Sequence, residues 1–276
     1  MAGFGSEASA ILRACLGHAR AEWLETARFK AMWLYQIGWA FLFFVPLALA
    51  GAAFGDAGFE ASGGGQSFLA YAVTGYVALN VAIGALWRGV EFLRRSNLTG
   101  TLAHVWVTEA PRWTALVGAT TVNVGFALFQ SLLVLLFVST LFRGHGFAIS
   151  MAAIAAVLVT LVAFFGMGLG FAGLGLVARG AQLPSALSAL AMVMAGSSYP
   201  IAILPWSVRW ITYVNPYTYV IDLLRTTTIG TQPLFPIGIE FLIVGAIALA
   251  SVAGGAWAYA RCERIAIQRG LVGLHA

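Results

Sequence analysis

Hydrophobic residues fill six long stretches of the chain, and short polar segments separate these stretches. A helix needs about 20 residues to cross the hydrocarbon core of a bilayer, which is about 30 Å thick. Six stretches are long enough, and each predicts a membrane-spanning helix: residues 33–54, 68–87, 113–142, 147–177, 183–204 and 234–259. The third and fourth exceed the minimum length, so we expect them to tilt or to project beyond the membrane. The pattern predicts an all-α integral membrane protein.

Residues 6–32 follow a different pattern, in which charged residues alternate with apolar ones. Ile11 with Cys15, and Leu12 with Leu16, recur at the spacing of one helix face. This arrangement is typical of an amphipathic helix that lies in the interface of a membrane. We therefore expect an N-terminal interfacial helix that turns into the bilayer at its end. A solvated leader helix is the alternative.

The longest polar interruption in the first half of the chain is residues 91–112. It contains three arginines, and Arg88 lies just before it. Basic residues favour the cytoplasmic ends of membrane helices. Gly100 frees the backbone near the centre of the segment, and Pro111 ends any helix that follows. The segment predicts a short cytoplasmic helix across the ends of the membrane helices, with an aromatic and aliphatic face.

The composition excludes a soluble domain. Of the 276 residues, 61% are hydrophobic and 9% are charged, and the mean hydropathy is +0.89, whereas a soluble domain carries about 25% charged residues. The net charge of +5 could indicate nucleic-acid binding, but the basic residues lie at the ends of apolar stretches. Membrane topology explains them better. Both termini and twelve of the fifteen Lys and Arg are then cytoplasmic, and three are outside: Arg143, Arg209 and Arg225.

Residues 196–232, which precede the last span, cannot form one continuous helix. A proline lacks an amide donor, and its ring clashes with the preceding helical turn. Three prolines interrupt the segment: Pro200, Pro205 and Pro216. Residues 206–214 and 217–229 are each too short to span a membrane. We expect two short helices that re-enter the outer leaflet and meet at Asn215.

Asp222 and Arg225 lie three residues apart in this segment, so their side chains share one helix face. A lone charge at the centre of a bilayer costs about 2.5–3.5 kcal/mol. That cost favours an ion pair between the two side chains or a position near the membrane surface.

Two stretches resemble the ABC-2 type exporter permeases. In the first, Gly-Thr-Leu is followed by an apolar run and then by Thr, Pro and Arg, like the family's cytoplasmic coupling helix. The residues are Gly100, Thr101, Leu102, His104, Val105, Trp106, Thr108, Glu109, Pro111 and Arg112. In the second, two prolines precede an NPxTYxxDxxR pattern. The residues are Tyr199, Pro200, Pro205, Trp206, Asn215, Pro216, Tyr219, Asp222 and Arg225. The second match is the more specific one.

The resemblance implies a role for each stretch. The coupling segment, residues 91–112, docks in a groove of a cytoplasmic ATP-binding-cassette ATPase subunit and carries its closure into the membrane. The outer re-entrant helices, residues 196–232, line or gate the extracellular exit. The resemblance covers nearly all of residues 1–276, which we interpret as a single transmembrane domain with six transmembrane helices.

The fourth apolar stretch is rich in glycine, and its spacing formally satisfies a dinucleotide-binding fingerprint. No strand precedes it, and no acidic residue follows about 20 residues later, as that site requires. Gly166 and Gly170 form a GxxxG pair, and Gly173 follows them. Small residues of this kind let helices approach closely in lipid. We expect these glycines to serve helix packing.

Chemistry for energy conversion is missing from the sequence. The only lysine, Lys30, is not preceded by the glycines of a phosphate-binding loop. The four histidines are far apart and form no metal-binding pattern. The middles of the spans hold essentially no ionisable residues, which disfavours a proton- or sodium-coupled transporter. We therefore expect a non-catalytic subunit without a metal or cofactor, whose partner ATPase holds ATP and Mg²⁺.

The sequence thus favours the permease subunit of an ATP-driven exporter in the plasma membrane. Two copies, or one copy with a related permease, would pair about a two-fold axis. Spans without charge favour a hydrophobic or amphipathic substrate, such as a drug or a lipid. A polysaccharide or lipid-linked glycan exporter is the main alternative, because aromatic residues near the N-terminus could stack on sugars. A channel or a membrane scaffold is a third interpretation.

Overall fold

The computed structural model describes most of the chain, and every regular element in the described part is a helix. The described residues are 2–28, 31, 34–35, 38, 41–42, 45–46, 49, 67–101, 111–141, 147, 149–177 and 182–270. The helices are α1 (Ala2–Arg28), α4 (Phe68–Leu98), α6 (Trp113–Leu141), α7 (Met151–Val177), α8 (Gln182–Val193), the 3-10 helix η1 (Ile201–Ile203), α9 (Trp206–Val214), α10 (Pro216–Ile229) and α11 (Ile237–Gln268). The prediction of an all-α fold is confirmed.

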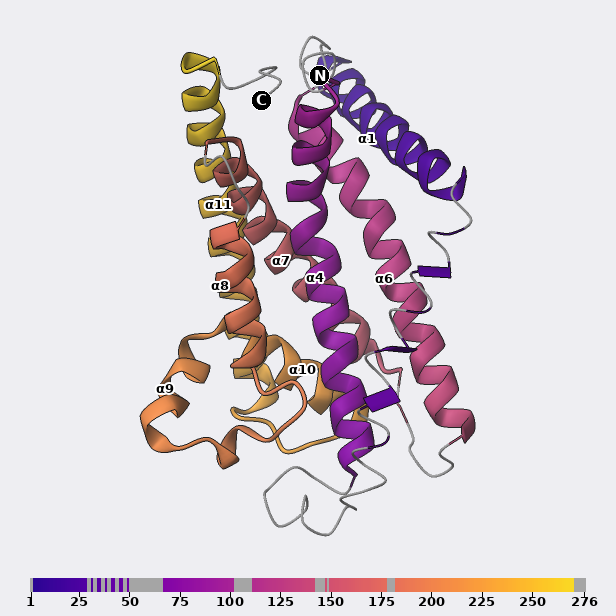
Figure 1. The fold of residues 1–276 in the computed structure, drawn as a ribbon, viewed down its shortest axis with the longest axis vertical. Coiled ribbons are helices and arrows are strands. Elements are labelled where there is room, and N and C mark those ends of the chain that lie inside the picture. Colours follow the sequence, from indigo (N-terminus) through magenta and orange to yellow (C-terminus); the bar gives the residue numbers. More distant parts are fainter. Residues whose placement is uncertain are drawn as a thin grey trace.

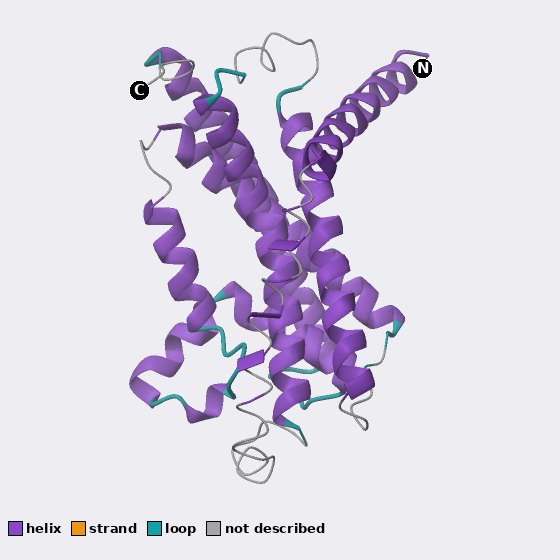
Figure 2. Cartoon of the chain, turned by 45° about the vertical axis from the view of Figure 1, so that its right-hand side comes forward, coloured by secondary structure: helices purple, strands orange, loops and turns teal. Residues whose placement is uncertain are grey.

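Four long helices form the body of the molecule. Figure 1 shows α4, α6, α7 and α11 running along its length, with α1 crossing the upper part of α6 and with α9 and α10 at the lower end. In sequence these four helices are long and apolar enough to cross a membrane. The start of α1 and the end of α11 lie at the same end (Figure 2). This arrangement fits an even number of membrane crossings.

The predicted helix ends agree with the structure where a turn signal marks them. The predicted span 113–142 is α6, and the two short helices predicted to meet at Asn215 are α9 and α10. Asn215 accepts a hydrogen bond from the Tyr217 amide, and Pro216 takes the first helical position of α10, which are favourable positions for Asn and Pro. Gly230 ends α10 with a φ of +69°, in the left-handed region that glycine tolerates.

Four predicted boundaries need correction, and the first is the start of the span predicted over 147–177, which begins at Met151. The helix predicted over 68–87 continues to Leu98, so residues 91–98 extend a membrane helix and are not part of a separate short helix. The last span continues beyond its predicted end to Gln268. The helix predicted over 183–204 ends at Val193, because Gly196 adopts a φ of +70° and a 3-10 turn follows. The first predicted span, residues 33–54, lies largely outside the described residues.

The closest helix packing is between α7 and α11. A Cβ atom added to Gly166 would lie 2.5 Å from the carbonyl carbon of Ser251, and one added to Gly173 would lie 2.8 Å from the Cα of Tyr259. A Cβ on Gly255 would overlap the carbonyl oxygen of Gly166. The glycines therefore bring the two backbones into direct contact, as small residues do between membrane helices.

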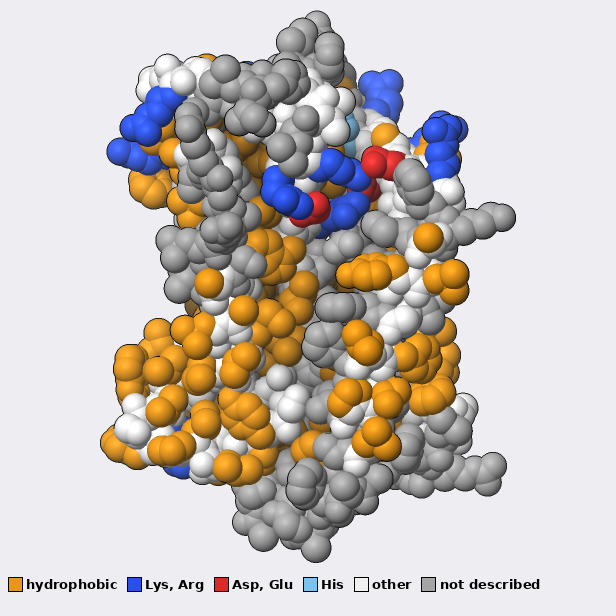
Figure 3. Space-filling view, viewed as in Figure 1, with side chains coloured by type: hydrophobic (Ala, Val, Ile, Leu, Met, Phe, Trp, Pro, Cys, Tyr) orange, Lys and Arg blue, Asp and Glu red, His pale blue; other side chains and the backbone are white. Residues whose placement is uncertain are grey.

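Polar and apolar side chains separate along the molecule. In the face shown in Figure 3, Lys and Arg side chains gather at the upper end and hydrophobic side chains cover the middle and lower parts. We call the upper end the arginine-rich end, because the last turns of α4 lie there with Arg88, Arg94 and Arg95, as does the start of α6, which follows Arg112. Large apolar side chains such as Leu242 and Leu249 of α11 are exposed on the long helices. Exposed leucines on long apolar helices are what a lipid-facing surface requires.

Candidate functional site

The arginine-rich end contains a cluster of charges that joins α1 to α4. The Glu22 side chain on α1 is 3% exposed and forms ion pairs with Arg88 and Arg95 of α4; the Arg95 Nη2 atom lies 2.8 Å from Glu22 Oε2. The other terminal nitrogen of Arg95, Nη1, lies 2.7 Å from Glu25 Oε1. One buried carboxylate is therefore shared by two arginines. Because an unpaired buried charge is costly, this cluster fixes α1 on the end of α4.

The crossing of α1 and α6 strengthens this attachment. A Cβ atom on Gly118 of α6 would lie 2.6 Å from the Cβ of His18 and 2.8 Å from the carbonyl oxygen of Cys15. The two helices therefore touch where α6 has no side chain. Burial at this crossing lowers the pKa of His18 below its ordinary value, because desolvation disfavours the charged imidazolium. The crossing favours a neutral His18.

Only the ends of the predicted coupling segment are described. Gly100 has a φ of +71° and follows the last turn of α4, where the Thr101 hydroxyl lies 2.9 Å from that of Thr99. At the other end, the Pro111 carbonyl accepts the Thr114 amide at 2.9 Å in the first turn of α6. The other predicted coupling residues lie outside the described residues: Leu102, His104, Val105, Trp106, Thr108 and Glu109.

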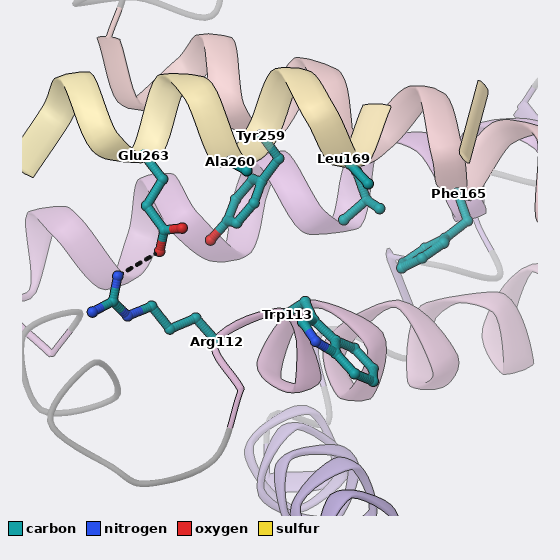
Figure 4. A pocket seen from close by; sticks show the side chains of 8 residues that line it. Arg112, Trp113, Phe165, Leu169, Tyr259, Ala260 and Glu263 are labelled. Carbon is teal, nitrogen blue, oxygen red and sulfur yellow. Dashed lines mark hydrogen bonds and ion pairs between the residues drawn. The ribbon is translucent and has the colours of Figure 1, made fainter. Parts of the chain in front are cut away.

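A pocket of about 410 Å³ lies beside the second end of this segment (Figure 4). Its polar side is the ion pair between Arg112 Nη1 and Glu263 Oε1, 2.9 Å apart, and its apolar walls include Trp113, Phe165 and Leu169. The pocket joins α6, α7 and α11. An amphipathic molecule matches this lining, with its apolar part along the rings and its polar part at the ion pair.

The opposite end of the molecule is organised by Arg225 of α10. This buried guanidinium donates Nε to the Tyr71 carbonyl at 3.2 Å, Nη1 to the Gly196 carbonyl at 2.9 Å, and Nη2 to the Ser197 carbonyl. It also stacks on the Tyr71 ring, with Cζ 3.4 Å from the ring centre. Gly75 makes room for this arrangement, since a Cβ there would overlap the Ser197 carbonyl oxygen. Arg225 thus holds the turn before η1 against α4.

The predicted ion pair between Asp222 and Arg225 does not form. The salt bridges found among the described residues do not include it. The Asp222 carboxylate instead accepts the Leu234 amide at 2.7 Å. Arg225 instead donates to the carbonyl oxygens of Gly196 and Ser197 in the turn before η1. The i,i+3 spacing permits the pair, but the tertiary fold gives both side chains backbone partners.

The remaining residues of the predicted outer gate divide into two groups. Tyr199 donates to the Val193 carbonyl at 2.5 Å, Asn215 donates to the Ala191 carbonyl at 2.5 Å, and Tyr219 donates to the Tyr213 carbonyl at 2.6 Å. The hydroxyl and amide groups thereby tie the short helices together. Three prolines shape the chain: Pro200 is buried, Pro205 precedes α9 and Pro216 begins α10. Trp206 is 80% exposed on α9 and stands apart from the others.

The sequence interpretation gave no role to two acidic residues, although it placed Glu240 near the outer end of the last span. Glu22 had no distinguishing signal beyond its place in an amphipathic helix, because its partners on α4 lie 66 and 73 residues away. Glu240 is fully buried in the first turn of α11 and accepts the Phe235 amide at 3.2 Å. An acidic residue at the start of an apolar span is itself a signal, since burial of a carboxylate needs compensation. In the described part of the chain, no three His, Cys, Asp or Glu side chains form a metal-binding group.

Comparison with known proteins identifies a family. No curated protein matches the sequence closely enough to count as a relative. A family model described as ABC-2 type transporter matches residues 20–229, which include the charge cluster, the ends of the coupling segment and the Arg225 turn. The matched part is well over half of the chain, so the chain belongs to the ABC-2 type transporter family.

Proposed function

We propose that this chain is the permease subunit of an ATP-driven exporter for hydrophobic or amphipathic molecules. Family membership makes it the membrane component of an ABC transporter, which works with an ATP-binding-cassette ATPase subunit. The direction of transport, which is export, and the class of cargo go beyond family membership and are part of the proposal. The family match is the observation that carries it.

The arginine-rich end is the cytoplasmic end in this proposal. Arginines gather there, as the positive-inside rule requires of cytoplasmic ends. The start of α1 and the end of α11 lie at the same end, so both chain termini are cytoplasmic and the Arg225 turn faces outward. The protein then resides in the plasma membrane with its coupling segment toward the ATPase.

Energy reaches the membrane through the coupling segment. Two copies of the chain, or one copy and a related permease, pair around a two-fold axis and bind two ATPases through residues 100–112. ATP and Mg²⁺ bind to the ATPases. Their closure displaces the segment, and its two ends pass the displacement to α4 and α6, because Gly100 follows Thr99, the cap of α4, and Arg112 directly precedes α6.

The class of cargo follows from the surfaces available. The spans carry few charges, and the pocket beside Arg112 is lined mainly by apolar and aromatic side chains with one ion pair at its edge. Such a lining suits a molecule with an apolar body and a small polar group. A long sugar chain needs many polar partners along its path, which this pocket does not offer.

Co-purification with a candidate ATPase tests the proposal. We expect a stable complex with equal numbers of ATPases and permeases, and ATP hydrolysis that rises when an amphipathic substrate is added to the complex in lipid nanodiscs. Trp106→Glu should separate hydrolysis from transport if that residue contacts the ATPase, whereas Arg264→Gln, at an exposed position of α11 outside every predicted site, should leave coupling intact. A chain that purifies alone and alters no ATPase would refute the exporter proposal.

A further inference from the structure

Glu240 and Asp222 bring two carboxyl groups together between α10 and α11. Glu240 is fully buried. The Asp222 carboxylate accepts the Leu234 amide and Glu240 accepts the next amide along the chain, so the two carboxyl groups lie beside each other at successive amides. Glu240 Oε1 accepts the Phe235 amide at 3.2 Å. Glu240 Oε2 is buried and has no hydrogen-bond donor among the described residues. A buried acceptor without a donor, next to another carboxylate, is an unfavourable arrangement if both groups are ionised.

The surrounding groups do not provide the missing donor. Arg225 directs Nε, Nη1 and Nη2 to the carbonyl oxygens of Tyr71, Gly196 and Ser197. The Tyr71 hydroxyl donates to the Tyr199 carbonyl at 3.5 Å, and the Tyr199 hydroxyl donates to the Val193 carbonyl. Helix α7, which packs along α11, carries no ionisable residue over its whole length. The charged and titratable neighbours are therefore already engaged elsewhere.

One proton resolves this arrangement. If Glu240 is protonated at Oε2, that oxygen becomes a donor and Asp222 becomes its acceptor. The pair then carries a single negative charge, which the nearby Arg225 guanidinium balances at longer range. We propose that Glu240 and Asp222 form a proton-binding site, in which one proton is held by Glu240 and donated in a hydrogen bond to Asp222.

The proton also fastens the connection between α10 and α11. Asp222 accepts the Leu234 amide at 2.7 Å while Glu240 accepts the Phe235 amide, so the pair binds two successive amides of the linker 230–236. Loss of the proton leaves two carboxylates in contact, and their repulsion separates α10 from α11. Any effect of this separation on an outer exit rests on the proposed function, whereas the proton-binding site itself does not.

Infrared spectroscopy of the purified full-length chain in lipid nanodiscs tests the site directly, without an ATPase. A protonated carboxyl group has a C=O stretch that is separate from the carboxylate bands. We expect this signal at about pH 7, where an ordinary carboxyl is ionised. Glu240→Gln should remove it. Glu263→Gln should retain it, because Glu263 lies on the same helix but pairs with Arg112. Absence of the signal from the unsubstituted protein overturns the proposal without any variant.

Asp222→Asn assigns the same signal independently, because replacing the acceptor of the Glu240 proton must shift or abolish the band. A band that is unchanged in both the Glu240→Gln and the Asp222→Asn proteins belongs to another group and also overturns the proposal. As a second measurement, the melting midpoint of the unsubstituted chain should fall as the pH rises above about 4.3, where a glutamate of the unfolded chain ionises, and should level off once the folded pair has lost its proton. Glu240→Gln, which cannot ionise, should abolish most of that fall, and an equal fall in both proteins counts against the site.

Discussion

Replacing Glu22 by glutamine should release α1 from the arginine-rich end. The change removes the one carboxylate in the described part of the chain that pairs with both Arg88 and Arg95, whose side chains are 15% and 34% exposed. Removing one partner of a buried ion pair costs about 3–5 kcal/mol. We expect the lower value, about 3 kcal/mol, because a glutamine amide oxygen still accepts one hydrogen bond and because Arg95 keeps Glu25.

Cysteine labelling measures this release as a local opening. Thr26 lies one turn after Glu22 and is buried, so Thr26→Cys, in a chain whose Cys15 and Cys262 are replaced by serine, gives a thiol that reacts only when α1 moves away. Each 1.4 kcal/mol changes an equilibrium about tenfold. A loss of about 3 kcal/mol should therefore raise the labelling rate about a hundredfold, provided that closing is faster than labelling.

Glu25→Gln is the matched control. The Glu25 side chain is 51% exposed and pairs with Arg95 alone, and exposed ion pairs contribute about 1 kcal/mol at most. Its labelling rate should rise about fivefold or less. Equal rates for the Glu22→Gln and Glu25→Gln proteins would refute the claim that the shared buried carboxylate holds α1 in place.

Three further predictions concern other contacts. Gly255→Ala should lower the melting midpoint, because the new Cβ would overlap the α7 backbone, whereas Gly254→Ala, which meets nothing within 4 Å, should be neutral or slightly stabilising; similar midpoints would contradict the packing described. Asn215→Ala should cost about 1–2 kcal/mol of stability by removing the cap of α10, and Asn215→Asp, which keeps the capping oxygen, should recover part of it in the same melting assay. Because burial lowers the pKa of His18, the attachment of α1 should weaken as the pH falls below about 6.5, where the unfolded chain gains a proton. The labelling rate, divided at each pH by that of a fully exposed cysteine to correct for loss of thiolate, should then rise at acidic pH, and His18→Gln should remove this rise.

Much of the helical framework could be predicted because local signals mark its boundaries. The apolar run after Arg112 predicts α6, and the Asn215–Pro216 pair predicts the junction between α9 and α10. Asparagine and proline act through their own backbone geometry. Where such a residue coincides with a change of hydropathy, the sequence is sufficient to predict the helix boundary.

Hydropathy alone was misleading where apolar residues continue through a turn. Residues 183–204 are apolar enough for a span, yet the helix ends at Val193 and Gly196 turns the chain. Hydropathy measures transfer to lipid and contains no information about backbone direction. The same limit explains why α4 was predicted to end too early. Its last turns are polar but remain helical to Leu98, and Arg88 and Arg95 in these turns pair with Glu22 of α1.

Long-range polar contacts could not be predicted from spacing. Arg225 lies three residues from Asp222, but its hydrogen-bond acceptors are carbonyl oxygens 28, 29 and 154 residues away. Glu240 comes near Asp222 only because α10 and α11 contact each other and both side chains bind the linker between them. These contacts depend on how helices pack, and packing brings together residues whose separation in sequence carries no signal.

Helix α4 touches both ends of the molecule without a break. It has 31 residues, and at 1.5 Å per residue it is about 46 Å long. Arg88 and Arg95 near its end hold α1, and the Tyr71 carbonyl and ring near its start hold Arg225. A tilt of this one helix must displace the α1 cluster and the Arg225 turn in opposite directions. The two ends of the permease therefore share a rigid part, and a signal between them does not need a relay of separate contacts.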